Sequence, residues 1–266
     1  MKPTILFLFN SSTYAVAPWL ADGGYECVSI DYQSTDHSKA HRPLVEHPRH
    51  TRLNIDLSDS GAVETITECL NWHGLEQPSF ILSFAPCTDL AVSGAAHFAR
   101  KRSIDPLFQD KAVALCRLVE HWDCPSIVEN PVSVLATMWK KPTGYVHPWQ
   151  FSYLFDTLVG PHPEFPDVIP AYDWYNKKTG LWCQHGAAMP EIDWAAVKGP
   201  TSVNPGWAQL GGKSARTKYI RSLTPRGMAK AIYLANKDQI WATRGTQEAL
   251  SHVILETNPQ EQHSEN

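Results

Sequence analysis

Apolar runs rich in β-branched and aromatic residues alternate with stretches of helical period over the first half of the chain. The apolar runs have the length and composition of strands and fall at residues 4–8, 26–30, 52–55, 80–84 and 126–129. Residues 15–22 and 61–71 lie between such runs and have the pattern of helices. This alternation is typical of parallel strands joined by crossover helices. We therefore expect an α/β protein with a mostly parallel, doubly wound sheet.

Two further helices are expected beyond the first four strands. Asp105-Pro106 is a helix start, and a proline precedes a second helix at residues 226–237. Their apolar faces are Phe108, Ala112, Leu115 and Val119 in the first, and Met228, Ala231, Ile232 and Ala235 in the second. Residues 160–174, rich in proline, histidine and aromatics, predict a long ordered loop, and the polar tail after Glu256 predicts a frayed end.

The composition is that of one globular domain. The 266 residues bury one sizeable core, and a hydrophobic content of 43% with ten tryptophans excludes a disordered chain. No apolar run approaches the about 20 residues that span a bilayer, so we expect a cytoplasmic protein without a membrane partner. The six cysteines form no C-x-x-C pair, so we expect neither a disulfide framework nor a metal site.

Polar side chains follow each predicted strand. They are Asn10-Ser11-Ser12, Asp31, Asp56, Ala85-Pro86-Cys87 and Glu129-Asn130-Pro131. Ligands of open α/β sheets bind beyond the carboxyl ends of the strands, because the crossover loops leave a crevice there. The sequence therefore predicts a site at this edge of the sheet.

Cys87 and Glu129 are the residues of this set with the clearest chemistry. A cysteine next to a proline at a strand end lies on a tight, exposed turn, although a buried thiol is the commoner fate of a cysteine. A thiolate that adds to carbon 6 of cytosine makes carbon 5 nucleophilic, and an acid at ring nitrogen 3 assists the addition. Cys87 is the candidate nucleophile and Glu129 the candidate acid. The alternative for Glu129 is a helix-capping carboxylate.

In order along the chain, these segments resemble the cytosine-C5 DNA methyltransferase family. The likeness rests on Pro86-Cys87-Thr88, Glu129-Asn130-Pro131, Lys177-Lys178-Thr179-Gly180-Leu181-Trp182 and Arg221-Ser222-Leu223-Thr224-Pro225, and is greatest to small phage-type members. It implies a Rossmann-like sheet of the class I methyltransferase type. One domain, 1–266, would hold a donor-binding and nucleophile half (1–135), a substrate-contacting half (136–256) and a tail (257–266).

The resemblance also implies roles for individual residues. Cys87 and Glu129 would be catalytic. The residues expected to bind the substrate are Pro86, Thr88, Asn130, Lys177, Lys178, Thr179, Arg216 and Arg221. The residues expected to bind the donor are Phe9, Asn10, Ser11, Ser12, Thr13, Tyr14, Asp31, Tyr32 and Asp56.

Three departures from the family bear on the donor and the target. The family's first loop is glycine-rich for close approach to S-adenosylmethionine, yet no glycine occurs here before Gly23. Residues 246–266 contain no counterpart of the family's C-terminal element. The donor is therefore expected to be S-adenosylmethionine, giving methylcytosine, or 5,10-methylenetetrahydrofolate, giving hydroxymethylcytosine. Only 38 residues separate Trp182 from Arg221, so we expect little target selectivity.

The distribution of charge bears on the partner. The chain has a net charge of −4, but residues 213–230 contain six basic and no acidic residues. This run is either a phosphate-contacting face or a solvated basic helix. We expect DNA as the partner, either a duplex with a flipped base or a single strand. A catalytically silent nucleic-acid-binding relative and an enzyme acting on a free pyrimidine nucleotide are the alternatives, and the oligomeric state is not indicated.

Overall fold

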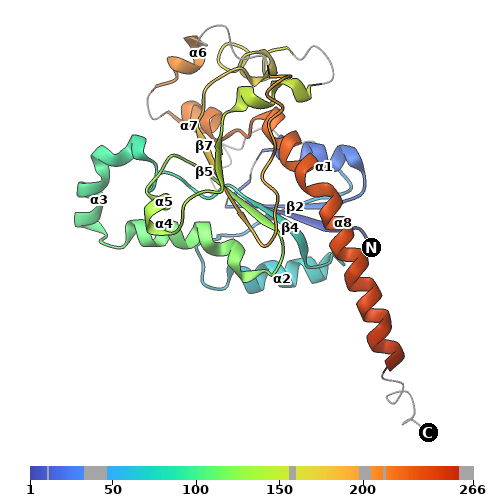
Figure 1. The fold of residues 1–266 in the computed structure, drawn as a ribbon. Helices are drawn as coiled ribbons and strands as arrows, with labels where there is room; N and C mark the ends of the chain where they lie inside the picture. The colour runs from blue at the N-terminus through green and yellow to red at the C-terminus, as the bar shows by residue number, and fades with distance from the viewer. Residues whose placement is uncertain (11, 33–46, 156–159, 198–204, 212–213, 258–266) are drawn as a thin grey trace.

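The computed structural model describes residues 1–10, 12–32, 47–155, 160–197, 205–211 and 214–257. They form one seven-stranded sheet in the order β3-β2-β1-β4-β5-β7-β6 (Figure 1). The strands are β1 (Thr4–Leu8), β2 (Glu26–Asp31), β3 (His50–Asn54), β4 (Pro78–Ser83), β5 (Ser126–Pro131), β6 (Gly144–Val146) and β7 (Thr179–Gln184). The first five strands pair in parallel, whereas β7 runs antiparallel to both β5 and β6. The expected Rossmann-like α/β architecture is confirmed.

Helices cover both faces of the sheet. The α-helices are α1 (Ala17–Asp22), α2 (Ala62–Trp72), α3 (Phe98–Ile104), α4 (Phe108–Arg117), α5 (Leu135–Met138), α6 (Pro205–Ala208), α7 (Ala215–Ser222) and α8 (Arg226–Thr257). Short 3-10 helices are η2 (Val92–His97), η3 (Leu118–His121), η4 (Pro148–Leu154) and η5 (Ala171–Asp173). In the part of the chain that is described, no helix is both long and apolar enough to cross a membrane.

The central strand β1 contributes side chains to the apolar layers on both faces of the sheet. Leu6 and Leu8 pack on one face with α2 and α4, and Ile5 and Phe7 pack on the other with α1 and α8 (Figure 1). Successive side chains of a strand point to opposite faces, so a strand buried on both sides is apolar throughout. This is why the run at 4–8 does not alternate with polar residues.

The five predicted strands and the first two predicted helices are confirmed, and the two later helices differ in their bounds. The helix expected at Asp105-Pro106 begins at Phe108, with α3 before it. The helix expected at residues 226–237 continues to Thr257 as α8, and the tail expected to fray lies outside the described residues from residue 258 on.

A third apolar cluster lies beyond the carboxyl edge of the sheet. Val168 and Ile169, from the loop expected at residues 160–174, pack with Ile220 and Leu223 around the end of α7. In Figure 1, α6 and α7 stand above the ends of β5 and β7. The C-terminal half of the chain therefore covers the edge at which the sequence predicts a site.

Buried Asp173 anchors the start of α8 to this cover. Its carboxylate accepts hydrogen bonds from Nη2 of Arg226 at 2.7 Å, from Nε at 3.0 Å and from the backbone N–H of Arg226 at 2.6 Å. The Asp173 side chain is 2% exposed and that of Arg226 is 17% exposed. Loss of one charge would leave the other largely buried without a partner.

Asp173→Asn is therefore expected to lower the free energy of unfolding by about 3 kcal/mol. The matched control is Asp167→Asn, which breaks the 3.0 Å ion pair with Arg216 at the surface, where both side chains are more than half exposed. That change is expected to cost less than about 1 kcal/mol. Urea unfolding of both variants measures the difference, and equal losses would contradict the role of Asp173.

Candidate active site

The candidate nucleophile lies on a tight turn directly after β4. Phe84 continues the strand pairing by donating its backbone N–H to the Leu8 carbonyl at 3.0 Å. The chain then turns, since the Cys87 carbonyl accepts the N–H groups of Leu90 and Ala91 at 3.0 and 2.8 Å. Cys87 is half-buried, whereas its expected substrate-binding neighbours Pro86 and Thr88 are exposed. A substrate can therefore approach the turn from the solvent.

The end of β5 lies against this turn. The side-chain amide of fully buried Asn130 donates a hydrogen bond to the Ala85 carbonyl at 3.1 Å, two residues before Cys87. Glu129 Oε1 and Asn130 Oδ1 are buried acceptors without a hydrogen-bond partner in the described part of the chain. Buried acceptors are normally satisfied, so both atoms are available to donors on a ligand. The expected convergence of Pro-Cys and Glu-Asn segments is present.

Lys177 joins the same group from the start of β7. Its ammonium lies 3.8 Å from Glu129 Oε1, with side-chain exposures of 17% for Lys177 and 12% for Glu129. Lys178 points elsewhere, over the ring of Tyr145 at 4.7 Å. Thr179 is buried, and its hydroxyl donates to the Lys177 carbonyl at 3.2 Å. Of the two lysines expected to bind the substrate, Lys177 is the one at the carboxylate.

The charges of Glu129, Lys177 and Arg221 act on the thiol of Cys87. Burial raises the pKa of Cys87, the charge of Glu129 raises it further, and the charges of Lys177 and Arg221 lower it, with a net rise. Arg221 is held on α7 by donating to the Leu210 carbonyl at 2.6 Å. The four side chains are thus close enough to interact electrostatically, and the Cys87 proton must leave when the sulfur attacks.

The loop expected to bind the donor makes hydrogen bonds to itself. Phe9 adopts the left-handed φ of 56° that a glycine favours. The amide of Asn10 donates to the Ser12 carbonyl and to Ser29 Oγ, and its oxygen accepts the Ser12 N–H. Ser11 lies outside the described residues. The Thr13 carbonyl accepts the N–H groups that open α1.

Tyr14 links this loop to the C-terminal cover. Its hydroxyl donates to Glu164 Oε1 at 3.2 Å, and its ring meets that of His162 edge-on at 4.8 Å. Burial, followed by the charge of Glu164, raises the pKa of the Tyr14 phenol. Tyr14, which was expected to bind the donor, is therefore engaged by the protein itself.

The acidic residues at the ends of β2 and β3 are less buried than Glu129. Asp31 ends β2 and is partly buried, and Tyr32 after it is 59% exposed. Asp56 is exposed and accepts both the N–H and the hydroxyl of Ser58, which lower the pKa of its carboxyl.

In the described part of the basic run at residues 213–230, most of the cationic side chains contact the protein itself. Arg226 is paired with Asp173, and Lys230 donates to the Leu154 carbonyl at 2.8 Å. Arg216 pairs with Asp167 at the surface and lies over the ring of Phe165. Lys213 lies outside the described residues, and Lys218 is exposed. Much of the run therefore holds the C-terminal half of the chain in place over the sheet edge. The charge pattern of the sequence does not reveal these contacts.

Two residues that sequence reasoning missed hold the nucleophile turn. Lys101, on α3, pairs with the Asp89 carboxylate and donates to the Thr88 carbonyl at 3.2 Å. Gln109, on α4, donates to the Asp89 carbonyl at 3.3 Å. No motif marks them, because their role depends on how the α3–α4 pair folds back onto the turn.

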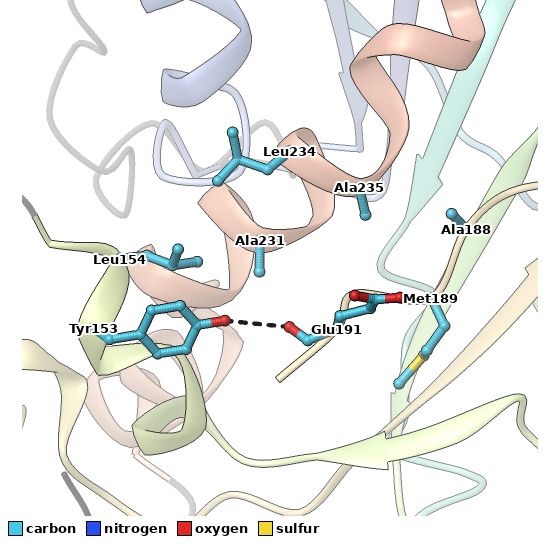
Figure 2. A pocket seen from close by; sticks show the side chains of 8 residues that line it. All are labelled: Tyr153, Leu154, Ala188, Met189, Glu191, Ala231, Leu234 and Ala235. Atoms are coloured by element: carbon cyan, nitrogen blue, oxygen red, sulfur yellow. Dashed lines mark hydrogen bonds between the residues drawn. The ribbon is translucent and has the colours of Figure 1, made fainter. Parts of the chain in front are cut away.

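A hollow of about 290 Å³ lies away from this group, between η4, α8 and the segment after β7. Figure 2 shows its lining residues: Tyr153, Leu154, Ala188, Met189, Glu191, Ala231, Leu234 and Ala235. The Tyr153 hydroxyl donates to the Glu191 carbonyl at 3.3 Å across it. None of Cys87, Glu129 and Lys177 lines this hollow.

Comparison with known proteins adds little to the geometry. Neither a protein-family model nor a curated protein matches the sequence. Among solved structures, one match is the Bordetella bronchiseptica enzyme WbmH in complex with NAD+, at 16% identity and a TM-score of 0.27, over 44% of this chain and 36% of that one. Another is a short chain dehydrogenase from Leptospira borgpetersenii with bound NAD+, at 11% identity and a TM-score of 0.26, over 47% and 49%.

The donors expected from the sequence are corrected. Both matched structures hold NAD+, and neither is described with S-adenosylmethionine or a folate. The loop after β1 gives a physical reason, because Asn10 and Ser12 bind each other and Tyr14 binds Glu164. S-adenosylmethionine and 5,10-methylenetetrahydrofolate are therefore not retained as donors. The likeness is too low to carry NAD+ over to this chain, so no donor is assigned.

Proposed function

We propose that this chain is an enzyme that adds the Cys87 thiolate to carbon 6 of cytosine in DNA and thereby activates carbon 5 for transfer of a one-carbon group. The proposal rests on one observation, the hydrogen bond from Asn130 to the Ala85 carbonyl. This bond ties the Glu-Asn segment to the Pro-Cys segment across two neighbouring parallel strands. It brings the segments that carry Glu129 and Cys87 together at one edge of the sheet.

Each residue of the group has a distinct role in the proposed reaction. The Cys87 sulfur bonds to carbon 6, the carbon 5–carbon 6 double bond opens, and Glu129 supplies a proton or a hydrogen bond to ring nitrogen 3. The free Asn130 Oδ1 accepts from the exocyclic amino group. Lys177 neutralises the Glu129 carboxylate once its proton has moved. Carbon 5 then bonds to the one-carbon group or, without a donor, to a solvent proton. Loss of the original carbon 5 proton, of the thiolate and of the proton on ring nitrogen 3 then restores the ring.

The sheet also supports a fold of the class I methyltransferase type. The order 3-2-1-4-5 agrees with the dinucleotide-binding sheet. The antiparallel β7 between β5 and β6 does not agree with it, and this inserted strand is what the methyltransferase type adds. It is also the strand that delivers Lys177 to Glu129.

Exchange of the cytosine carbon 5 hydrogen tests the proposal without a donor. When the thiolate adds in D₂O, carbon 5 takes up a deuteron, loses its proton, and the thiolate leaves, so the base gains one mass unit. We expect this exchange in a cytosine oligonucleotide incubated with the protein, measured by mass spectrometry of the nucleosides. Cys87→Ala should abolish it, and the absence of exchange with the unaltered protein would refute the proposed chemistry.

A catalytically silent, nucleic-acid-binding relative is the second candidate. The observation in its favour is the loop after β1, whose Asn10 and Ser12 groups are satisfied within the protein. This candidate predicts retention of oligonucleotides without any exchange at carbon 5. The same experiment therefore separates the two functions.

A further inference from the structure

Two exposed aromatic rings, a partly buried third ring and a lysine lie at the outer end of the sheet, at the edge that carries the candidate active site. We call Tyr145, Trp149 and Trp194, together with Lys178, the aromatic strip. The rings of Trp149 and Trp194 meet edge-on at 6.5 Å, and the Lys178 ammonium lies 4.7 Å from the centre of the Tyr145 ring. Trp194 is 64% exposed and Tyr145 is 39% exposed, whereas Trp149 is partly buried. Large exposed aromatic groups of this kind mark interaction sites.

The topology places the strip at the same edge as Cys87. Strand β6 runs parallel to β5, because both are antiparallel to β7, so Trp149 follows the carboxyl end of β6. The indole N–H of Trp149 donates to Asn176 Oδ1 at 3.0 Å, in the segment that leads into Lys177 and Lys178. Lys177 reaches Glu129, and the next residue belongs to the strip. The aromatic strip is therefore next to Lys177 and Glu129.

The rings are held in place before any ligand binds. The Asp193 N–H donates to the Tyr153 hydroxyl at 3.2 Å, which fixes the turn that carries Trp194. The Asp193 carboxylate accepts the N–H groups of Ala195 and Ala196. The acid nearest Trp194 in sequence is thus engaged with the backbone. His147 lies in the same region, where burial and then the Lys178 charge lower its pKa and so favour the neutral ring.

We infer that the aromatic strip binds single-stranded nucleic acid by stacking bases on Trp194 and Trp149, with Lys178 at the phosphate backbone. Aromatic platforms beside a cation bind unpaired bases with little regard to sequence, since every base has a flat π-face. A strand held there delivers a cytosine to Cys87 without the cost of extruding it from a duplex. The inference rests on the proposed function and names its substrate as the single strand.

Binding of a thymine-only 12-mer tests the strip, because the oligonucleotide contains no cytosine and no adduct can form. Trp194→Ala in the full chain is expected to weaken binding about tenfold, measured by fluorescence anisotropy of the labelled strand. Trp194→Phe, which keeps a ring, should bind within about threefold of the unaltered protein. The control is Trp72→Ala, since Trp72 is 87% exposed at the end of α2 and lies outside the strip.

Three results would overturn the inference. One is unchanged binding by Trp194→Ala, another is an equal loss in Trp72→Ala, and the third is equal or tighter binding of a duplex of the same length. Failure of the carbon 5 exchange with intact binding of the thymine strand would reject the catalytic proposal alone. Failure of the unaltered protein to bind the thymine strand, with exchange intact on free cytosine nucleotides, would reject the strip alone.

Discussion

Cys87→Ser is expected to abolish covalent trapping of an oligonucleotide that carries 5-azacytosine. The nitrogen at position 5 of this base makes carbon 6 more electrophilic and takes up a proton once a thiolate has added, so the adduct persists. A serine hydroxyl at the same place is a far weaker nucleophile, because its proton is held at neutral pH. We expect a band of protein joined to the oligonucleotide in a denaturing gel with the unaltered chain and none with the variant.

The matched control for this substitution is Cys69→Ser. Cys69 is a partly exposed free thiol on α2, away from the turn that carries Cys87. The Cys69→Ser variant should trap the oligonucleotide as the unaltered chain does. Trapping that persists in Cys87→Ser, or that disappears in Cys69→Ser, would assign the chemistry to a different residue.

The meeting of Cys87 and Glu129 could be predicted because it follows from the topology of parallel strands. Each strand is a continuous apolar run, and the residues after neighbouring parallel strands must share one edge. The position of Lys177 was not predictable in this way. It depends on β7, which pairs antiparallel with β5 over a separation of about 50 residues and carries no alternating pattern, since Leu181 and Trp182 are both buried.

The identity of the donor is where the prediction from sequence was wrong. The positions after β1 matched the place of a donor loop, but position alone does not show which polar groups remain free. Phe9 takes the conformation expected of glycine, and Asn10 and Ser12 satisfy each other. The short β6 was missed for another reason: three residues are too few to show a period, and its pairing with β7 is set by tertiary contacts.

Glu129→Gln is expected to slow carbon 5 exchange by about 10²- to 10⁴-fold, the usual contribution of a general acid. Glutamine keeps the shape and a hydrogen bond but has no proton to transfer to ring nitrogen 3. The matched control is Glu120→Gln, which alters a carboxylate bound to Arg117 on the surface of η3 and should leave exchange unchanged.

The same variant should make Cys87 more reactive toward a simple alkylating agent. Glu129 raises the pKa of Cys87, so removal of its charge lowers that pKa and increases the thiolate fraction at a given pH. The pH profile of iodoacetamide alkylation should therefore move to lower pH, while carbon 5 exchange becomes slower. A merely structural effect would slow both reactions or neither. Opposite changes in the two rates are what an acid beside a nucleophile requires. In the free protein the carboxylate charge hinders formation of the thiolate, and in the complex with the base the carboxyl proton assists the addition.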